Sequence, residues 1–207
     1  MSYGYIGDTS TSINQQKKNA GVLSVSDVLD LESQGFLGGS LELIEENVIS
    51  SNVTSVDFNN IYGDKYNVHA LEIRGLECDG GGSILVGVRF STDGGSSYIS
   101  TTDYQTAQET FASAGSSSLQ QNNSNNQINL GYSNDTEQNN SIVYIYDANN
   151  SAKYTWLSHM SMKQGLDFSI GGGVYDTAAT INGIQVRGGT FDTGVVRLYG
   201  VKTRWVH

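Results

Sequence analysis

Residues 84–100 read ILVGVRFSTDGGSSYIS, and this stretch indicates the fold class. Its apolar residues recur at every second position, as Ile84, Val86, Val88 and Phe90. A period of two places them on one face of a pleated strand. The glycines after Asp93 supply the positive φ angles that a tight turn needs. The stretch therefore predicts a β-hairpin whose second strand covers residues 97–103.

The same alternation recurs between turn clusters along the rest of the chain and predicts about ten strands. We expect them at residues 41–49, 53–58, 66–76, 84–91, 97–103, 128–132, 142–147, 153–161, 168–174, 181–187 and 195–201. The strand at 142–147 is apolar at nearly every position and is expected to be buried on both faces. Residues 104–114 fit a short helix or a strand, and residues 116–127 form a polar stretch. The expected fold is all-β: an antiparallel β-sandwich or jelly roll.

Composition and charge limit the partners of the chain. Its 207 residues suffice for one sizeable core. With 21 acidic and 11 basic residues, it should be repelled by nucleic acid and by anionic membranes. No segment approaches the roughly 20 apolar residues of a membrane-spanning helix, and we expect no signal peptide. The single cysteine, Cys78, cannot form an intramolecular disulfide and is expected to be a small core residue.

Residues 1–39 differ from the β-rich remainder and predict an extended docking arm that precedes a domain of residues 40–207. Residues 2–19 are mostly polar, with the aromatic Tyr3 and Tyr5 near their start. A short helix at about 24–34 follows, because Ser24 and Asp27 resemble a capping box and Gly35 supplies a stop. Its apolar face would carry Val25, Val28 and Leu29. Such a helix is marginal alone and needs a surface to cover it.

No recognisable catalytic arrangement appears in the sequence. The histidines His69, His159 and His207 stand in unrelated contexts and read as strand-face or interface residues. Glu45 and Glu46 would point to opposite faces of a strand, which suits a charged strand edge better than a glycosidase pair. The glycine triplets at 80–82 and 171–173 lack the features of phosphate loops and predict turns or bulges. We therefore expect no enzyme, no metal and no cofactor.

Residues 91–98, STDGGSSY, resemble the Asp-box turn of sialidase-type propellers, with Tyr98 at the usual tryptophan position. In that motif the aspartate binds nearby backbone amides, so the implied role is structural. Among the aromatic residues, Trp156 is expected in the core. Tyr98, Tyr104 and Tyr132 lie near turns and are candidates for surface contact, with a packing role as the alternative.

Three longer stretches carry a family resemblance. They are GVLSVSDVLDLESQGFLGGSLEL at 21–43, RFSTDGGSSYISTTDY at 89–104, and GGGVYDTAATINGIQVRGGTFDTGVVRLYGV at 171–201. Together they resemble virion structural proteins of tailed bacteriophages of the marine type, in which a leader precedes a β-domain that closes on a Leu-Tyr-Gly strand. The chain departs from that pattern at Tyr175-Asp176, where a Leu-Pro-like pair is expected, and in its last residues.

Two classes of function follow. The resemblance implies a non-enzymatic exterior component of the virion, either a tail-fibre or attachment appendage or a capsid decoration protein, made in the host cytoplasm. The alternative is a free-standing carbohydrate-binding β-sandwich module or a glycan-degrading enzyme of that fold. The arm favours the first class. Expected partners are other virion proteins, further copies of the chain, with a trimer favoured, and a glycan of the host surface.

Overall fold

The computed structural model describes residues 40–80, 82–165 and 167–202. The chain divides into two units between Ser40 and Leu41, and the second unit is the one described here. The predicted arm, with Tyr3, Tyr5 and the helix at about 24–34, lies outside the described residues. Every regular element within the described residues is a β-strand.

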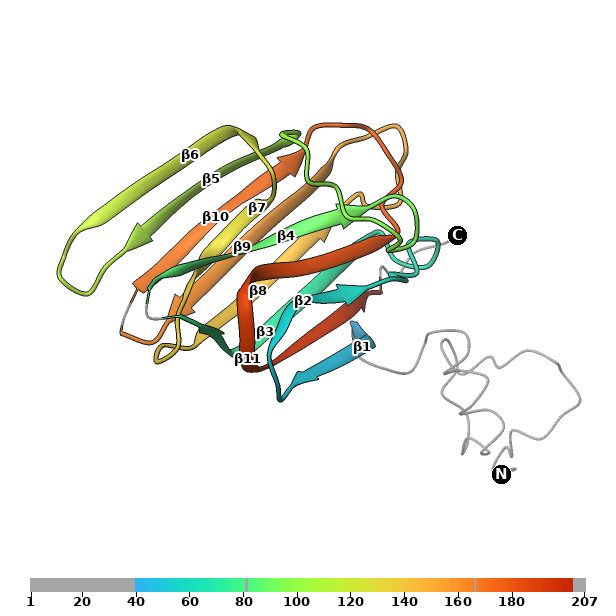
Figure 1. Cartoon of the computed structure of the whole chain (residues 1–207). Coiled ribbons are helices and arrows are strands. Elements are labelled where there is room, and N and C mark those ends of the chain that lie inside the picture. Colours follow the sequence, from blue (N-terminus) through green and yellow to red (C-terminus); the bar gives the residue numbers. More distant parts are fainter. Residues whose placement is uncertain (1–39, 81, 166, 203–207) are drawn as a thin grey trace, which may run out of the picture. The chain divides into compact units, whose positions relative to one another are not determined.

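The fold is a sandwich-like antiparallel sheet of eleven strands that nearly closes on itself (Figure 1). The strands are β1 (Leu41–Ile49), β2 (Val53–Phe58), β3 (Val68–Asp79), β4 (Ile84–Ser91), β5 (Tyr104–Phe111), β6 (Ser117–Asn125), β7 (Ile128–Ser133), β8 (Asn139–Tyr146), β9 (Thr155–Lys163), β10 (Asp167–Tyr175) and β11 (Gly183–Val201). The main path of pairing runs β6-β5-β10-β9-β8-β3-β11-β4-β7. The all-β prediction is confirmed.

The long strand β11 forms the corner of the structure. Its first part pairs with β2 on one side and β4 on the other, and its second part pairs with β1 and β3. Figure 1 shows the strand bending between these parts. Gly194 lies at the bend with a φ of 141°, and a Cβ there would come within 2.9 Å of the Leu76 backbone. Only glycine fits this conformation without strain.

The main core fills the space between the strands that pair with the first part of β11 and those that pair with its second part. Its largest fully buried side chains include Phe58, Phe90, Phe191 and Leu71 from strands near the corner and Tyr104 from β5. Cys78 belongs to the same cluster, as predicted. Strand β7 packs against β9, β10 and β5, so its Ile128 and Leu130 extend the core beneath those strands.

The predicted hairpin at 84–103 is only half correct. β4 forms as expected, but residues 97–103 are not a strand. β4 already has a partner on each side, β7 and β11, which leaves no free edge for a local hairpin partner. A backbone bond from Ile99 N–H to the Phe90 carbonyl, at 2.9 Å, still ties the returning segment to the end of β4.

Three other local predictions need correction or completion. The segment that fitted either a helix or a strand forms strand β5, and the polar stretch after it forms strand β6 rather than a connection. The glycines at 171–173 lie inside the regular strand β10, not in a turn. A Cβ on Gly171 would collide with the backbone of β5 at Ala107, so close approach between these two strands accounts for that glycine.

Candidate interaction surface

The outward side of strands β8, β9 and β10 forms a continuous surface that we call the outer face. The strand registers place its side chains in rows, with Tyr146 opposite Trp156 and Ile142 opposite Met160. The rows continue onto β10, where Ile170 lies opposite Met160. The outward positions are 140, 142, 144 and 146 on β8, 156, 158, 160 and 162 on β9, and 168, 170, 172 and 174 on β10. None of them carries a charged residue.

This outer face is apolar and open to solvent. Trp156 is 51% exposed and Met162 is 54% exposed, and the rings of Tyr144 and Tyr146 stack with centroids 6.5 Å apart. The surface continues through Phe111 and Leu119 on β5 and β6, and the register places the apolar residues of β1 on the same side of the sheet. Among the described residues, every exposed large hydrophobic side chain except Tyr62 and Tyr154 lies on this side: Leu41, Leu43, Val48, Phe111, Leu119, Ile142, Tyr144, Tyr146, Trp156, Met160, Met162 and Ile170.

Two predictions about burial are wrong here. Trp156 is not a core residue, and β8 is not buried on both faces, because its outward positions are exposed while Val143 and Ile145 are buried. The alternation in β9 was visible in the sequence. It distinguishes two faces of a strand but does not say which one points inward, so neither the burial of Trp156 nor that of both faces of β8 follows from it.

The inward side of the same strands is buried and partly polar. Its side chains include Asn139, Ser141, Thr155, His159, Ser161 and Ser169. They bind one another: the Ser141 hydroxyl donates to the Asn139 side-chain oxygen at 2.6 Å and lies 2.6 Å from the Ser161 hydroxyl. Val143, Ile145 and Leu157 also point inward and belong to the main core, so the interior of β8–β10 is mixed while the exposed outer side is largely apolar.

His159 is the least satisfied group of this polar interior. Neither of its ring nitrogens has a hydrogen-bond partner among the described residues, although the side chain is only 3% exposed. Burial disfavours the charged imidazolium and lowers the pKa of His159 to about 4. Burial also lowers the pKa of His69, which is partly offset by the contact of its Nε2 with the Ile61 carbonyl at 2.7 Å. Both histidines are neutral packing residues at pH 7.

The three tyrosines predicted as surface contacts do not meet on the outer face. Tyr104 is fully buried, and its hydroxyl accepts from Phe90 N–H and donates to the Ile99 carbonyl, so it has the packing role that was the alternative and is not a surface contact. Tyr98 is half-buried and donates to Asn59, while Tyr132 accepts from Gln120. The arm residues Tyr3, Tyr5, Val25, Val28 and Leu29 lie outside the described residues.

The Asp-box turn has the structural role that its sequence predicts. The Asp93 carboxylate accepts from Ser97 N–H at 2.9 Å, from the Ser97 hydroxyl at 2.6 Å and from the Ser91 hydroxyl at 2.7 Å. These bonds lower the pKa of Asp93 to about 2. All of its partners are residues of the turn itself, so the carboxylate closes the loop and is not available as a catalytic base.

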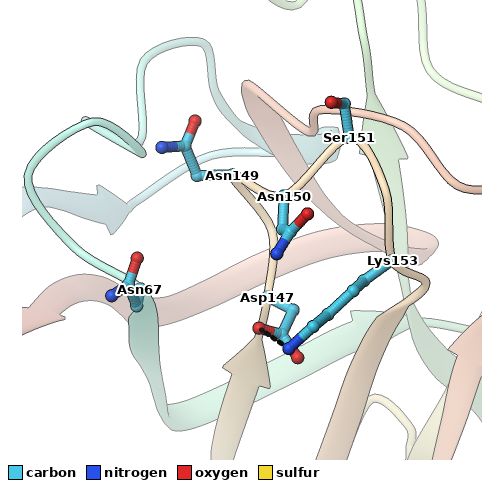
Figure 2. A pocket seen from close by; sticks show the side chains of 6 residues that line it. All are labelled: Asn67, Asp147, Asn149, Asn150, Ser151 and Lys153. Atoms are coloured by element: carbon cyan, nitrogen blue, oxygen red, sulfur yellow. Dashed lines mark hydrogen bonds and ion pairs between the residues drawn. The ribbon is translucent and has the colours of Figure 1, made fainter.

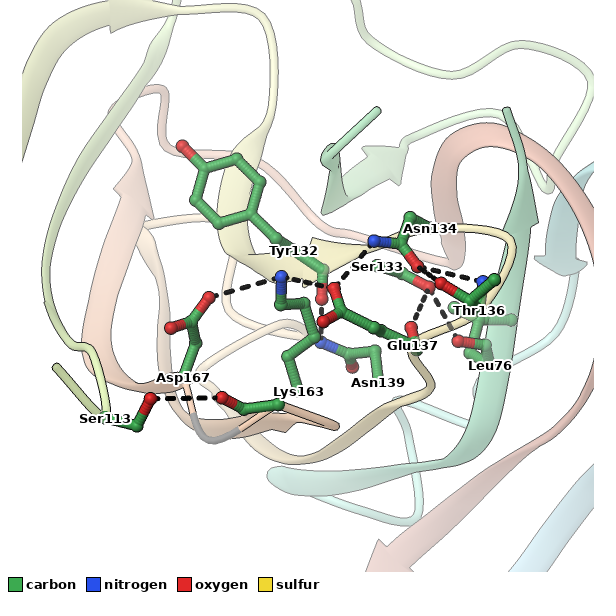
Figure 3. A network of polar contacts seen from close by, with 11 residues as sticks. Leu76, Ser113, Tyr132, Ser133, Asn134, Thr136, Glu137, Asn139, Lys163 and Asp167 are labelled. Carbon is green, nitrogen blue, oxygen red and sulfur yellow. Dashed lines mark hydrogen bonds and ion pairs between the residues drawn. The ribbon is translucent and has the colours of Figure 1, made fainter. Parts of the chain in front are cut away.

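The densest network of charged contacts joins two connections of the sheet (Figure 3). Lys163 lies 2.6 Å from Glu137 and 3.3 Å from Asp167, and Glu137 also accepts from Asn134 at 2.6 Å. Burial would lower the pKa of Lys163, but its hydrogen bonds to Glu137 and Asp167 raise it above its usual value. The same contacts lower the pKa of Glu137. Lys163 is thus too firmly protonated to be a nucleophile, and Glu137 is a poor proton acceptor.

A polar depression lies at the turn between β8 and β9 (Figure 2). It is lined by Asn67, Asp147, Asn149, Asn150, Ser151 and Lys153. Lys153 pairs with Asp147 at 3.4 Å, and Asp147 adopts a φ of 59° to form the turn. The depression offers amide and carboxylate groups, but its lining includes no histidine, cysteine or second acid for catalysis.

The part of the chain that the structure describes holds no group of three histidine, cysteine or acidic side chains able to bind a metal. Within the same residues there is also no helix of the length and apolarity required to cross a membrane. Comparisons with protein-family models, with curated proteins and with solved structures gave no significant match to this chain. The outer face is consequently the strongest candidate for a functional surface.

Proposed function

We propose that this chain is a non-enzymatic structural component on the exterior of a tailed-phage virion, either a short tail appendage or a capsid decoration protein. The outer face is the observation that carries the proposal. Proteins that act as free monomers rarely expose an apolar surface of this extent, and tryptophan, tyrosine and methionine are enriched in protein interfaces. The sequence resemblance to virion structural proteins supports a virion as the assembly to which this surface contributes.

The arrangement of polar groups supports a structural rather than a catalytic role. His69 and His159 are buried, and neither forms a hydrogen bond to an acid or a serine in the described network. Glu137 and Asp167 pair with Lys163, and Asp93 closes its own turn. A catalytic site needs a nucleophile or base that can reach a substrate, and these groups are engaged elsewhere.

Labelling of intact particles tests this proposal. Antibodies raised against the full chain, carrying gold, should bind the exterior of purified virions of the phage that encodes it, at the head surface or at the tail. Particles that lack both the label and the chain itself by mass spectrometry would contradict the proposal. The position of the label distinguishes the decoration protein from the appendage.

The predicted docking role of residues 1–39 calls for a separate experiment. A full-length chain carrying Val25→Asp and Leu29→Asp should fold normally but lose its place in the particle, because an apolar helix face could no longer be covered there. Ser10→Asp together with Ser12→Asp adds the same charge at polar positions of the arm and is the control. Normal incorporation of the Val25 and Leu29 variant would contradict the docking role.

A carbohydrate-binding module is the second candidate, and one observation favours it. The aromatic side chains Tyr146 and Trp156 lie opposite each other on β8 and β9, and the polar depression begins at the next residue, Asp147. Sugar rings stack on aromatic faces while their hydroxyls bind amides and carboxylates. A glycan array should then show binding that Trp156→Ala and Asp147→Asn abolish and that Tyr154→Ala leaves intact.

A further inference from the structure

We propose that two copies of this chain pack outer face against outer face around a twofold axis. The inference goes beyond the proposed function and does not depend on it, since it concerns only the chain and its own surface. It names the partner that covers the apolar side of β8–β10.

The size of the surface fits a stable pairing. The exposed side chains that span β8, β9, β10, β5 and β6 are 37–65% exposed. With about 200 Å² for each large side chain when fully open, they present roughly 800 Å² to solvent. A standard protein interface buries about 800 Å² on each partner. The uncharged β8–β10 face supplies roughly 600 Å² of this area, and the rest comes from Phe111 and Leu119 on β5 and β6, which lie beside Glu109. Together they supply the area that a dimer needs.

Charge and composition indicate that the partner is a second copy. Each chain carries a net charge of -10, so two copies repel each other unless they meet through a neutral surface. The outer face of β8–β10 bears no charge, whereas the next strands carry Glu109 on β5 and the Glu72–Arg197 pair on β3 and β11. Within the described residues, the exposed large hydrophobic side chains away from this side of the sheet are only Tyr62 and Tyr154. Among the described residues, the apolar surface that a second copy can offer is therefore the same face.

The shape of the surface allows this contact. Two sheets stack face to face about 10 Å apart when their side chains interdigitate. On β9 and β10 one row carries small residues, Ser158 and Gly172, while the same row holds Tyr144 on β8; the rows beside it hold the larger Trp156 and Met160. The large side chains of one copy can then occupy the space above the small residues of the other. Methionine side chains adapt easily to such packing.

A contact between identical faces is isologous and produces an even number of copies. It differs in this respect from the trimer that the sequence favours, in which each copy would offer two different surfaces to its neighbours. Sedimentation equilibrium of the full chain at micromolar concentration separates these outcomes. We expect a species of twice the chain mass of 22.3 kDa.

Two variants and one matched control locate the contact. Met160→Glu and Ile170→Glu place a carboxylate in the centre of the paired faces, where it would be desolvated without a partner. Each should raise the dissociation constant about 100-fold or more while the far-ultraviolet circular dichroism stays that of the folded wild type, because both positions are open to solvent in the single chain. Tyr154→Glu changes an exposed residue of similar accessibility off the face and should leave the dimer intact.

Any one of three results overturns the inference. These are a wild-type chain that remains monomeric, a trimer, and a dimer that both glutamate variants leave unchanged. If one glutamate variant fails to fold, the other carries the comparison, because the two positions lie on different strands. Particle labelling can succeed or fail independently of these results, so the two proposals are tested apart.

Discussion

The corner of the molecule and the β8–β10 region use the same strand pattern with opposite polarity. At the corner, β11 turns Val196 and Leu198 inward and Arg197 outward, where Arg197 contacts Glu46 and Glu72. In β8–β10, serine and histidine lie inside and tryptophan and methionine lie outside. The corner thus buries its apolar side chains and turns its charged ones outward. The β8–β10 region leaves large apolar side chains open to solvent in the single chain.

This difference predicts separate roles for the two regions: the corner stabilises the folded single chain, and the outer face stabilises association. Burial of apolar surface at the corner stabilises the single chain. The buried hydroxyls of β8–β10 contribute little net stability, because their hydrogen bonds only replace those made with water. The apolar outer face gains its burial only on association. Substitutions in the two regions should therefore affect different measurements.

The largest effect is expected in the corner core. Phe191→Ala removes a fully buried ring and should lower the free energy of unfolding by about 3–5 kcal/mol. Met162→Ala on the outer face should cost less than about 1 kcal/mol in the dilute chain, because its side chain is already half in water. Urea unfolding at low protein concentration measures both. Equal losses would show that the two regions do not differ in this way.

The polar interior should make the protein sensitive to acid. The pKa of His159 falls from about 6.5 in the unfolded chain to about 4 in the folded chain. Between these values the unfolded chain binds the additional proton, so stability is complete above pH 6.5 and decreases as the pH falls towards 4. The loss should reach about 3 kcal/mol near pH 4.

His159→Leu tests the origin of that sensitivity. The substitution removes a titrating group whose two ring nitrogens lack partners among the described residues, so stability at pH 7 should be unchanged or higher. The difference in unfolding free energy between pH 7 and pH 4 should shrink by about 3 kcal/mol relative to wild type. An identical pH profile for variant and wild type would assign the acid sensitivity to other groups.

A smaller effect is expected at Tyr104. Tyr104→Phe keeps the buried ring but leaves Phe90 N–H without its acceptor, and it should cost about 1–2 kcal/mol. Tyr175→Phe is a matched control, because its ring lies 5.3 Å from that of Tyr104 and no hydroxyl bond of Tyr175 occurs in the described network. Thermal unfolding compares them, and a loss at Tyr175 as large as that at Tyr104 would count against the role of the hydroxyl.

Local patterns in the sequence predicted most strands well, and they failed where non-local contacts decide the outcome. Alternation located β1, β2 and β4 to the residue. The hairpin after β4 was wrong because β7 and β11, distant in sequence, pair with that strand instead. Residues 117–125 lack the apolar alternation of a strand, yet the backbone of β5 gives them a partner to bind.

The outer face was missed for a related reason. The alternation of large apolar residues with threonine, histidine and serine in β9 is present in the sequence, whereas β8 is apolar at both sets of positions from 142 to 146. Standard reasoning places the apolar set inside, and only the position of these strands in the sheet shows that it lies outside. Ser141, His159 and Ser161 gave no opposite signal, because serine and histidine are also common on the solvent side of a strand.

Oxidation of Met160 and Met162 tests directly whether the outer face is covered in the working protein. Dilute peroxide, with mass spectrometry of the peptide that holds both residues, reports their access to solvent at each protein concentration. We predict fast oxidation in the dilute chain, where both side chains are about half exposed, and strong protection as the concentration rises. Ile170→Glu should remain fast throughout. Oxidation of the wild type at one rate over the whole concentration range would contradict the account.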